Sequence, residues 1–152
     1  MLDAACGFGR NAIALAQREF TVVCAERDKS RIEALKRFAE INKLTFKGRL
    51  LPIRVELSRS EWPFVPSCFS AVVFVHHMDV LLFPSVHCSL IPGGHLYLET
   101  VGGQGSNYFE LPAAGELHSL LCNQFRFDLY HERAVGPVAM GRRAVKLCAK
   151  KM

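Results

Sequence analysis

The sequence lacks paired cysteines and the spacing of a metal site. Its six cysteines are scattered over 152 residues, with no C-x-x-C pair and no Cys and His residues at ligand spacing. This pattern argues against a secreted disulfide framework and against a zinc centre. We therefore predict that the cysteines are reduced and mostly buried, and that the protein binds no metal.

Long apolar runs are also absent. No stretch approaches the roughly 20 apolar residues that a membrane-spanning helix requires, and Asp3 and Arg10 interrupt the apolar start of the chain. The sequence thus predicts neither a membrane span nor a signal peptide. We expect a cytoplasmic protein with no membrane partner.

Half of the residues are apolar, and a chain of this length buries roughly 70% of its unfolded surface on folding. Residues 1–152 are therefore expected to form a single domain. The formal net charge is +5, but the basic residues are spread over 29–59 and gathered again only at 142–151. A solvated surface is favoured over RNA binding, which stays a weaker alternative.

Strand-like and helix-like patterns follow each other along the chain. Strands are predicted at 2–5, 20–25, 50–57, 71–75, 95–100, 125–133 and 144–150, and helices at 10–18, 29–42, 84–90 and 114–123. Asp28 stands at an N-cap position, and Pro92-Gly93-Gly94 is typical of a stop ahead of a new strand. Alternating strands and helices predict a doubly wound α/β fold with a mostly parallel seven-stranded sheet.

The last two predicted strands break this order. Only residues 134–143 connect them, with Gly136 and Gly141 among them. A parallel crossover needs a dozen or more residues and usually a helix. These strands are therefore expected to pair antiparallel, so that the sheet contains an antiparallel C-terminal strand.

A glycine-rich turn links the first predicted strand to the first predicted helix. The residues GFGRNA at 7–12 fit G-x-G-x-x-A, in which glycines permit a tight turn and a close approach of a cofactor to the backbone. An ordinary strand-to-helix turn is the alternative. Glu26 ends the second strand, where a carboxylate accepts ribose hydroxyls, although a surface acid paired with Arg27 or Lys29 is also open.

Asp3 helps to decide between two candidate cofactors that both contain adenosine. It ends the first predicted strand, where a pyrophosphate on the next helix N-terminus would meet a like charge. S-adenosylmethionine brings an ammonium and a sulfonium to the same place, and a carboxylate stabilises both. The charge pattern favours the methyl donor over NAD.

At these residues the chain resembles a known family. LDAACGFGRNAIALA is similar to motif I of class I S-adenosylmethionine-dependent methyltransferases, and AERD resembles their second motif. VEL, CFSAVVFVHH and LIPGGHLYLET are similar to the motifs that follow, in the family's order. The resemblance covers about residues 1–150 and implies a Rossmann-like fold, S-adenosyl-L-methionine as cofactor, and an antiparallel strand beside the fifth.

The resemblance also implies a role for individual residues. It places Asp3, Ala5, Gly7 and Gly9 around the methionine moiety, and Glu26 and Arg27 at the ribose. It places Glu56 and Leu57 near the adenine, and Val75 and His76 beneath the donor. His76 and His77 follow the fourth strand, and they are weak candidates for a catalytic base. A His pair that caps this strand is the favoured alternative.

The family usually carries one or two helices ahead of motif I, where this sequence begins, so a truncated or weakly active form is expected. The glycine-rich loop at 102–107 is predicted to be mobile, and little lid remains after it. We predict a methyltransferase acting on a small molecule. An inactive S-adenosylmethionine-binding regulatory module and an NAD-dependent oxidoreductase are the alternatives, and the sequence predicts no oligomeric state.

Overall fold

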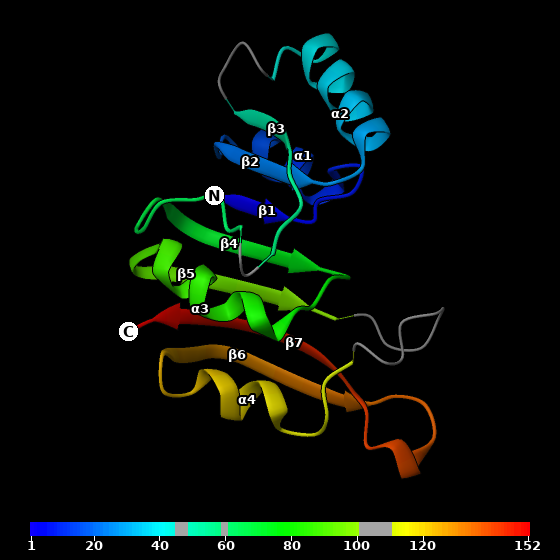
Figure 1. Ribbon diagram of the computed structural model, residues 1–152, viewed down its shortest axis with the longest axis vertical. Coiled ribbons are helices and arrows are strands. Elements are labelled where there is room, and N and C mark those ends of the chain that lie inside the picture. The colour runs from blue at the N-terminus through cyan, green and yellow to red at the C-terminus, as the bar shows by residue number, and fades with distance from the viewer. Residues whose placement is uncertain (45–48, 59–60, 101–110) are drawn as a thin grey trace. The chain divides into compact units, whose positions relative to one another are not determined.

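The computed structural model describes residues 1–44, 49–58, 61–100 and 111–152. The chain divides into two compact units, Met1–Phe64 and Val65–Met152. Figure 1 shows the ribbon coloured along the sequence, with the first unit in blue and cyan and the second from green to red. The predicted loop at 102–107 lies outside the described residues.

The described residues of the first unit form three parallel strands and two helices. Its strands are β1 (Leu2–Ala4), β2 (Val22–Glu26) and β3 (Leu50–Arg54), in the spatial order β3-β2-β1. The helices are α1 (Arg10–Gln17) and α2 (Lys29–Ile41). Parallel pairing brings the carboxyl ends of the three strands to one edge, which is where ligands bind in such sheets.

Small residues let α1 lie close to the strands of this unit. Ala12 and Ala16 of α1 are fully buried, in one cluster with Val22 and Cys24 of β2 and Leu35 of α2. The cluster therefore joins both helices to the same side of β2. Asp28 caps α2 as predicted, because its Oδ1 accepts hydrogen bonds from the N–H groups of Ser30 and Arg31.

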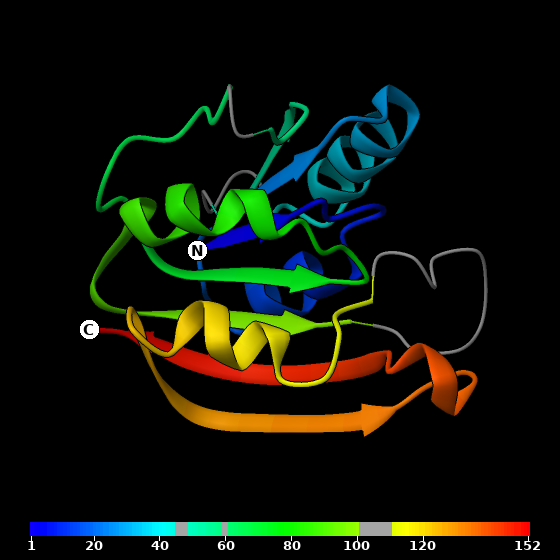
Figure 2. The same ribbon diagram turned by 60° about the horizontal axis from the view of Figure 1, so that its bottom comes forward.

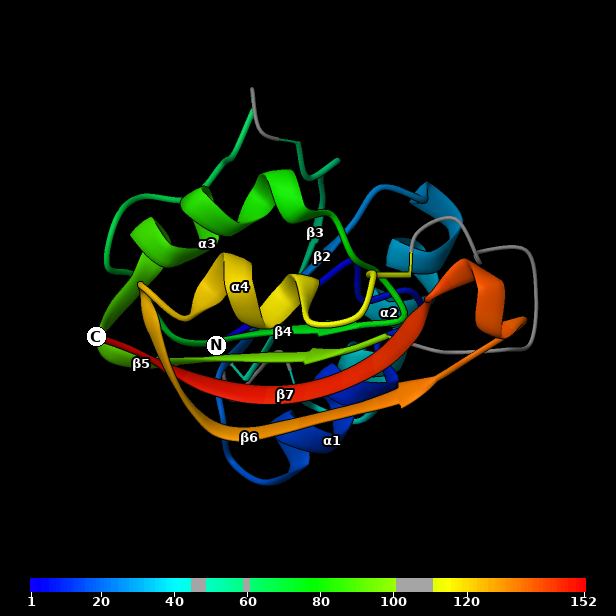
Figure 3. The same cartoon turned by 90° about the horizontal axis from the view of Figure 1, so that it is seen from below.

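The second unit is a four-stranded sheet of order β4-β5-β7-β6. Its strands are β4 (Phe69–Val75), β5 (Leu90–Glu99), β6 (Phe125–Ala134) and β7 (Arg143–Lys151). Its helices are α3 (Phe83–Ser89) and α4 (Glu116–Leu121), with 3₁₀ turns at Val80–Leu82 and Val138–Met140. Figures 2 and 3 show α3 and α4 on the same face of this sheet.

The direction of the strands confirms the predicted fold class. β4 and β5 run parallel, whereas β7 is antiparallel to both β5 and β6. The antiparallel strand therefore lies beside the fifth strand, where the family resemblance implies it. With three parallel strands in the first unit, the chain has the seven strands, mostly parallel, of a doubly wound Rossmann-like fold.

Two predictions about local structure are wrong. Pro92-Gly93-Gly94 is not a stop ahead of a strand, because β5 begins at Leu90 and runs through it. The ladder between β4 and β5 shifts register here, and Gly93 takes up the irregularity with a φ of 73°. The third strand ends at Arg54, three residues earlier than expected.

The cysteines are free but not mostly buried. Only Cys24 is buried, and Cys6 and Cys148 are partly exposed. The exposed ones lie where elements begin or end: Cys68 just before β4, Cys88 in the last turn of α3, and Cys122 directly after α4. Within the described part of the chain, every helix is too short or too polar to cross a bilayer.

Candidate functional site at the strand ends

The glycine turn between β1 and α1 has the backbone that the sequence predicts. Gly7 and Gly9 have φ values of 59° and 76°, in the left-handed region that favours glycine. The Gly9 N–H donates a 2.9 Å hydrogen bond to the Cys6 carbonyl, which closes the turn. A Cβ on Gly9 would lie 2.6 Å from Leu35 Cδ1, so this glycine also permits contact with α2.

Ala5 shares the left-handed backbone without being a glycine. Its φ is 55°, and the next residue, Cys6, donates its N–H to the Ala25 carbonyl at 2.9 Å. A left-handed conformation costs an alanine about 1–2 kcal/mol. Such strain gathers at functional sites, and no residue type near Ala5 in the sequence signals it.

Asp3 is the middle residue of β1 rather than its last, and its side chain is buried against the start of α1. Its side chain accepts a 3.0 Å hydrogen bond at Oδ2 from the Ala12 N–H, and the residue is only 2% exposed. Burial raises the pKa of Asp3 from 3.8 to about 6, and the hydrogen bond from Ala12 opposes this rise only in part. The site thus keeps a carboxylate that the fold itself destabilises.

Glu26 connects the end of β2 to the glycine turn. Its Oε2 accepts the Gly7 N–H at 2.9 Å, and its Oε1 accepts the Asp28 N–H at the same distance. The residue is 6% exposed. The alternative of a surface acid paired with Arg27 or Lys29 is therefore wrong, because Arg27 pairs with Glu56 and Lys29 with Glu33.

Arg27 and Glu56 form an exposed pair beyond the ends of β2 and β3. Arg27 Nη1 lies 3.2 Å from Glu56 Oε1, and the Val55 N–H donates to the Glu26 carbonyl at 3.0 Å. Leu57 follows, partly exposed. The predicted ribose and adenine residues of the first unit therefore lie along the carboxyl ends of neighbouring strands.

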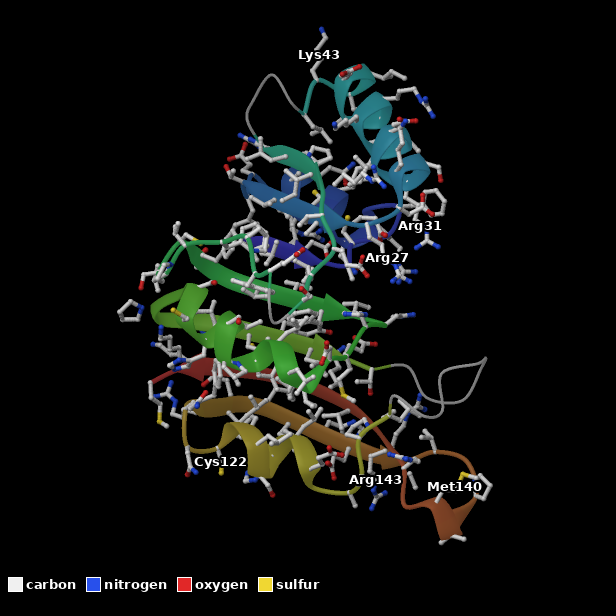
Figure 4. The ribbon with its side chains drawn as sticks, in the orientation of Figure 1. Arg27, Arg31, Lys43, Cys122, Met140 and Arg143 are labelled. Atoms are coloured by element: carbon white, nitrogen blue, oxygen red, sulfur yellow. The ribbon has the colours of Figure 1, made fainter. Side chains whose placement is uncertain are left out.

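Arg31 belongs to the same group of side chains, and sequence reasoning missed it. Its Nη1 lies 3.8 Å from Glu26 Oε2, and its Nε lies 3.9 Å from Asp28 Oδ2. Figure 4 shows Arg31 and Arg27 near the start of α2, with Lys43 beyond its other end. The spacing of Arg31 from Asp28, three residues along one helix, is the only sequence signal of this contact.

In the second unit, the predicted residues follow β4. His76 has a φ of 62°, and its N–H donates to the Glu99 carbonyl at 2.9 Å. The side chain of His76 is exposed, whereas His77 stacks on Phe74 with ring centroids 6.1 Å apart. Val75 is the last residue of β4 and is partly buried. The contact of His77 with Phe74 is the kind that a structural residue makes.

Glu99, at the end of β5, carries a polar cluster that the sequence did not indicate. Tyr97 donates its hydroxyl to Glu99 Oε2 at 2.7 Å, and Lys146 Nζ of β7 lies 3.5 Å from the same oxygen. The hydrogen bond from Tyr97 is the main cause of a lowered pKa of Glu99. Among the described residues, no group of three or more His, Cys, Asp or Glu residues is arranged to hold a metal ion.

Comparison with solved structures identifies the fold. No protein-family model and no curated protein sequence matches the chain. A SAM-dependent methyltransferase from Methanosarcina mazei is 19% identical, with a TM-score of 0.74 over 99% of this chain and 91% of that one. Geranyl diphosphate C-methyltransferase from Streptomyces coelicolor is 14% identical, with a TM-score of 0.77 over 99% and 72%.

A third similar structure carries a different chemistry. The 4+2 cyclase SpnF is 16% identical, with a TM-score of 0.77 over 99% of this chain and 73% of that one. The chain therefore has the class I methyltransferase fold, as the sequence resemblance implies. One fold hosts several activities, so the function has to be argued from the residues of the site.

Proposed function

We propose that residues 1–152 form one S-adenosyl-L-methionine-binding domain of a methyltransferase. The observation that carries the proposal is Glu26, a buried carboxylate at the end of β2 that is hydrogen-bonded to Gly7 of the glycine turn. This contact brings a ribose acceptor beside a turn that admits a ligand close to its backbone. The arrangement suits the adenosine half of the cofactor.

The methionine half of the cofactor would lie at the start of α1. Asp3 supplies a negative charge there, and the positive end of the α1 dipole favours the carboxylate of the ligand. A cationic ligand would compensate the cost of ionising Asp3 in a buried place. In this proposal Ala5, Gly7 and Gly9 line the turn, and Arg27, Glu56 and Leu57 border the adenosine.

S-adenosyl-L-methionine supplies an activated methyl group when it is bound. The chain's own residues hold and orient it, and in-line displacement from a sulfonium depends mainly on such alignment. A base is needed only where the acceptor has a proton to lose. His76 is the better placed of the two histidine candidates, because its side chain is exposed beyond β4, whereas His77 stacks on Phe74. The place of Val75 and His76 beneath the donor stays a prediction.

We further propose a small molecule as methyl acceptor. Geranyl diphosphate, which is small, is bound in the structure of the similar methyltransferase from Streptomyces coelicolor. RNA stays the less favoured acceptor, because several basic side chains are already paired with acids, including Arg27, Arg31 and Arg49. The cytoplasmic location also stays a prediction.

Calorimetric titration tests the proposal. We expect S-adenosylmethionine and S-adenosylhomocysteine to bind the wild-type chain, with no heat from NAD. Asp3→Ala and Glu26→Ala should each abolish binding while circular dichroism shows a folded protein. Unchanged affinity in both variants would remove the site assignment, and tight NAD binding would favour the oxidoreductase, although the antiparallel β7 already argues against that alternative.

A binding protein without methyl transfer is the second candidate. SpnF, named a cyclase, shows that this fold is not confined to methyl transfer, so donor binding alone does not imply a methyltransferase. The two candidates differ in turnover. Formation of S-adenosylhomocysteine in the presence of a set of small acceptors supports the methyltransferase, whereas tight donor binding with no turnover supports the binding module.

A further inference from the structure

We infer that Arg31 is a positioning residue for the ribose, one that holds the Glu26 carboxylate in place without occupying its hydrogen-bonding capacity. The inference rests on the proposed function. It starts from the distance of 3.8 Å between Arg31 Nη1 and Glu26 Oε2, which is within ion-pair range but beyond a hydrogen bond. The guanidinium therefore acts on Glu26 through its charge.

The place of Arg31 is set by the start of α2. Its N–H donates to Asp28 Oδ1 at 3.2 Å, as part of the cap of the helix. Its Nε lies 3.9 Å from the other oxygen of the same carboxylate. Backbone and side chain are thus both held by Asp28, so the guanidinium loses little further freedom when it lies beside Glu26.

Arg31 also reaches the glycine turn. The centre of its guanidinium lies 5.5 Å from the centroid of the Phe8 ring, a cation–π distance. An added Cβ on Gly7 would lie 4.0 Å from Arg31 Nη1, so the guanidinium passes close to the turn. Phe8 is 67% exposed, so this contact lies at the surface of the turn. One side chain therefore connects Glu26, Gly7 and Phe8.

The hydrogen bonds of Glu26 show why this arrangement suits a ribose. An ionised carboxylate accepts about four hydrogen bonds. Two backbone N–H groups, from Gly7 and Asp28, use one position on each oxygen. The remaining positions match two neighbouring hydroxyls of a ribose. A guanidinium at hydrogen-bond distance would compete for them, and one at 3.8 Å does not.

The test compares Arg31→Met with Arg37→Met, a charge-matched control on the exposed side of α2. Titration uses S-adenosylhomocysteine and its 2′-deoxyribose analogue. We expect Arg31→Met to weaken binding of S-adenosylhomocysteine about fivefold and to leave the weaker binding of the deoxy analogue nearly unchanged. Arg37→Met should resemble the wild type. An equal loss for both ligands would overturn the inference, because it would mean a general disturbance of the turn.

A second pair of variants tests whether Arg31 acts through Glu26. In a Glu26→Gln background, Arg31→Met should change the affinity less than twofold, because the charge on which it acts is gone. Arg31→Lys should recover part of the affinity. Full additivity with Glu26→Gln would overturn the inference. If the wild type binds neither ligand, the proposed function is wrong. If the wild type binds and Arg31→Met binds equally well, only this inference is wrong.

Discussion

The two units hold their carboxylates in different ways. In the first unit, Asp3 and Glu26 are 2% and 6% exposed, and backbone N–H groups are their hydrogen-bond donors. In the second unit, the side chain of Glu99 is 37% exposed and is satisfied by Tyr97 and Lys146. The first arrangement depends on the backbone fold, and the second on side chains at a surface.

This difference indicates where the fold accepts the cost of burying a charged group. Burying a carboxylate is unfavourable, and a fold keeps one mainly where a ligand or a mechanism needs it. A half-exposed ion pair loses little solvation on folding and adds little to the free energy of unfolding. The two buried acids at the glycine turn are therefore expected to lower the stability of the fold more than the half-exposed Glu99 does. Four variants test the contrast.

The largest effect is expected for Gly9→Ala. The added Cβ would lie 2.6 Å from Cδ1 and 2.8 Å from Cδ2 of Leu35, a core residue that is 2% exposed, so this packed side chain would have to shift. The positive φ of Gly9 adds backbone strain. We expect a loss of about 3 kcal/mol in the free energy of unfolding, measured by urea denaturation.

Gly115→Ala is the matched control in the second unit. Gly115 has a φ of 72°, but an added Cβ would meet no atom within 4 Å. Only the backbone strain remains, so we expect a loss of about 1 kcal/mol. Equal losses at Gly9 and Gly115 would mean that the contact with Leu35 contributes nothing.

Asp3→Asn is expected to stabilise the protein at neutral pH. The pKa of Asp3 is raised to about 6 by burial, so the folded state binds this proton more tightly than the unfolded chain. The free energy of unfolding should therefore fall as the pH rises from about 4 to 6. Asn does not ionise, so the variant should lack this fall and be about 2 kcal/mol more stable at pH 7.5.

Denaturation curves at pH 4 and pH 7.5 check this prediction. The variant should also bind S-adenosylhomocysteine more weakly, which would make it more stable and less functional at once. The same pH dependence in the wild type and in Asp3→Asn would show that another group titrates.

Thr100→Val tests a buried polar contact of the second unit. Thr100 follows β5, is 7% exposed, and its Oγ1 accepts a 2.9 Å hydrogen bond from the Val145 N–H of β7. Valine keeps the shape and removes the acceptor, so we expect a loss of about 1.5 kcal/mol. Thr100→Ser retains the hydroxyl and should be closer to the wild type. A smaller loss in Thr100→Val than in Thr100→Ser would contradict the prediction, because it would mean that the packing of the methyl group contributes more than the hydrogen bond.

Glu99→Gln is expected to have the smallest effect. The hydrogen bond from the Tyr97 hydroxyl persists with an amide oxygen, and only the half-exposed charge pair with Lys146 is lost. The change in the free energy of unfolding should be about 0.5 kcal/mol or less. A loss above that of Thr100→Val would contradict the contrast between the buried and the exposed acids.

Much of the fold was predictable because its signals are local. The small residues after the glycine turn, the cap at Asp28 and the short link between the last strands each follow from short-range sterics or chain length. The predicted stop at Pro92-Gly93-Gly94 was wrong because pairing with β4 continues β5 through it, with a shift of register. The cysteines were placed by residue type alone, which ignores that three of them lie near element ends.

By itself, the sequence determined the order of strands and helices, the glycine turn, and the place of Glu26 at the end of a strand, because periodicity and turn chemistry act between residues that are close in the chain. Only the tertiary structure decided that Glu26 bonds to Gly7, that Arg31 lies beside both, and that Ala5 is strained. These contacts join separate elements, and their geometry follows from how the helices pack on the sheet. No pattern along the chain encodes such a distance.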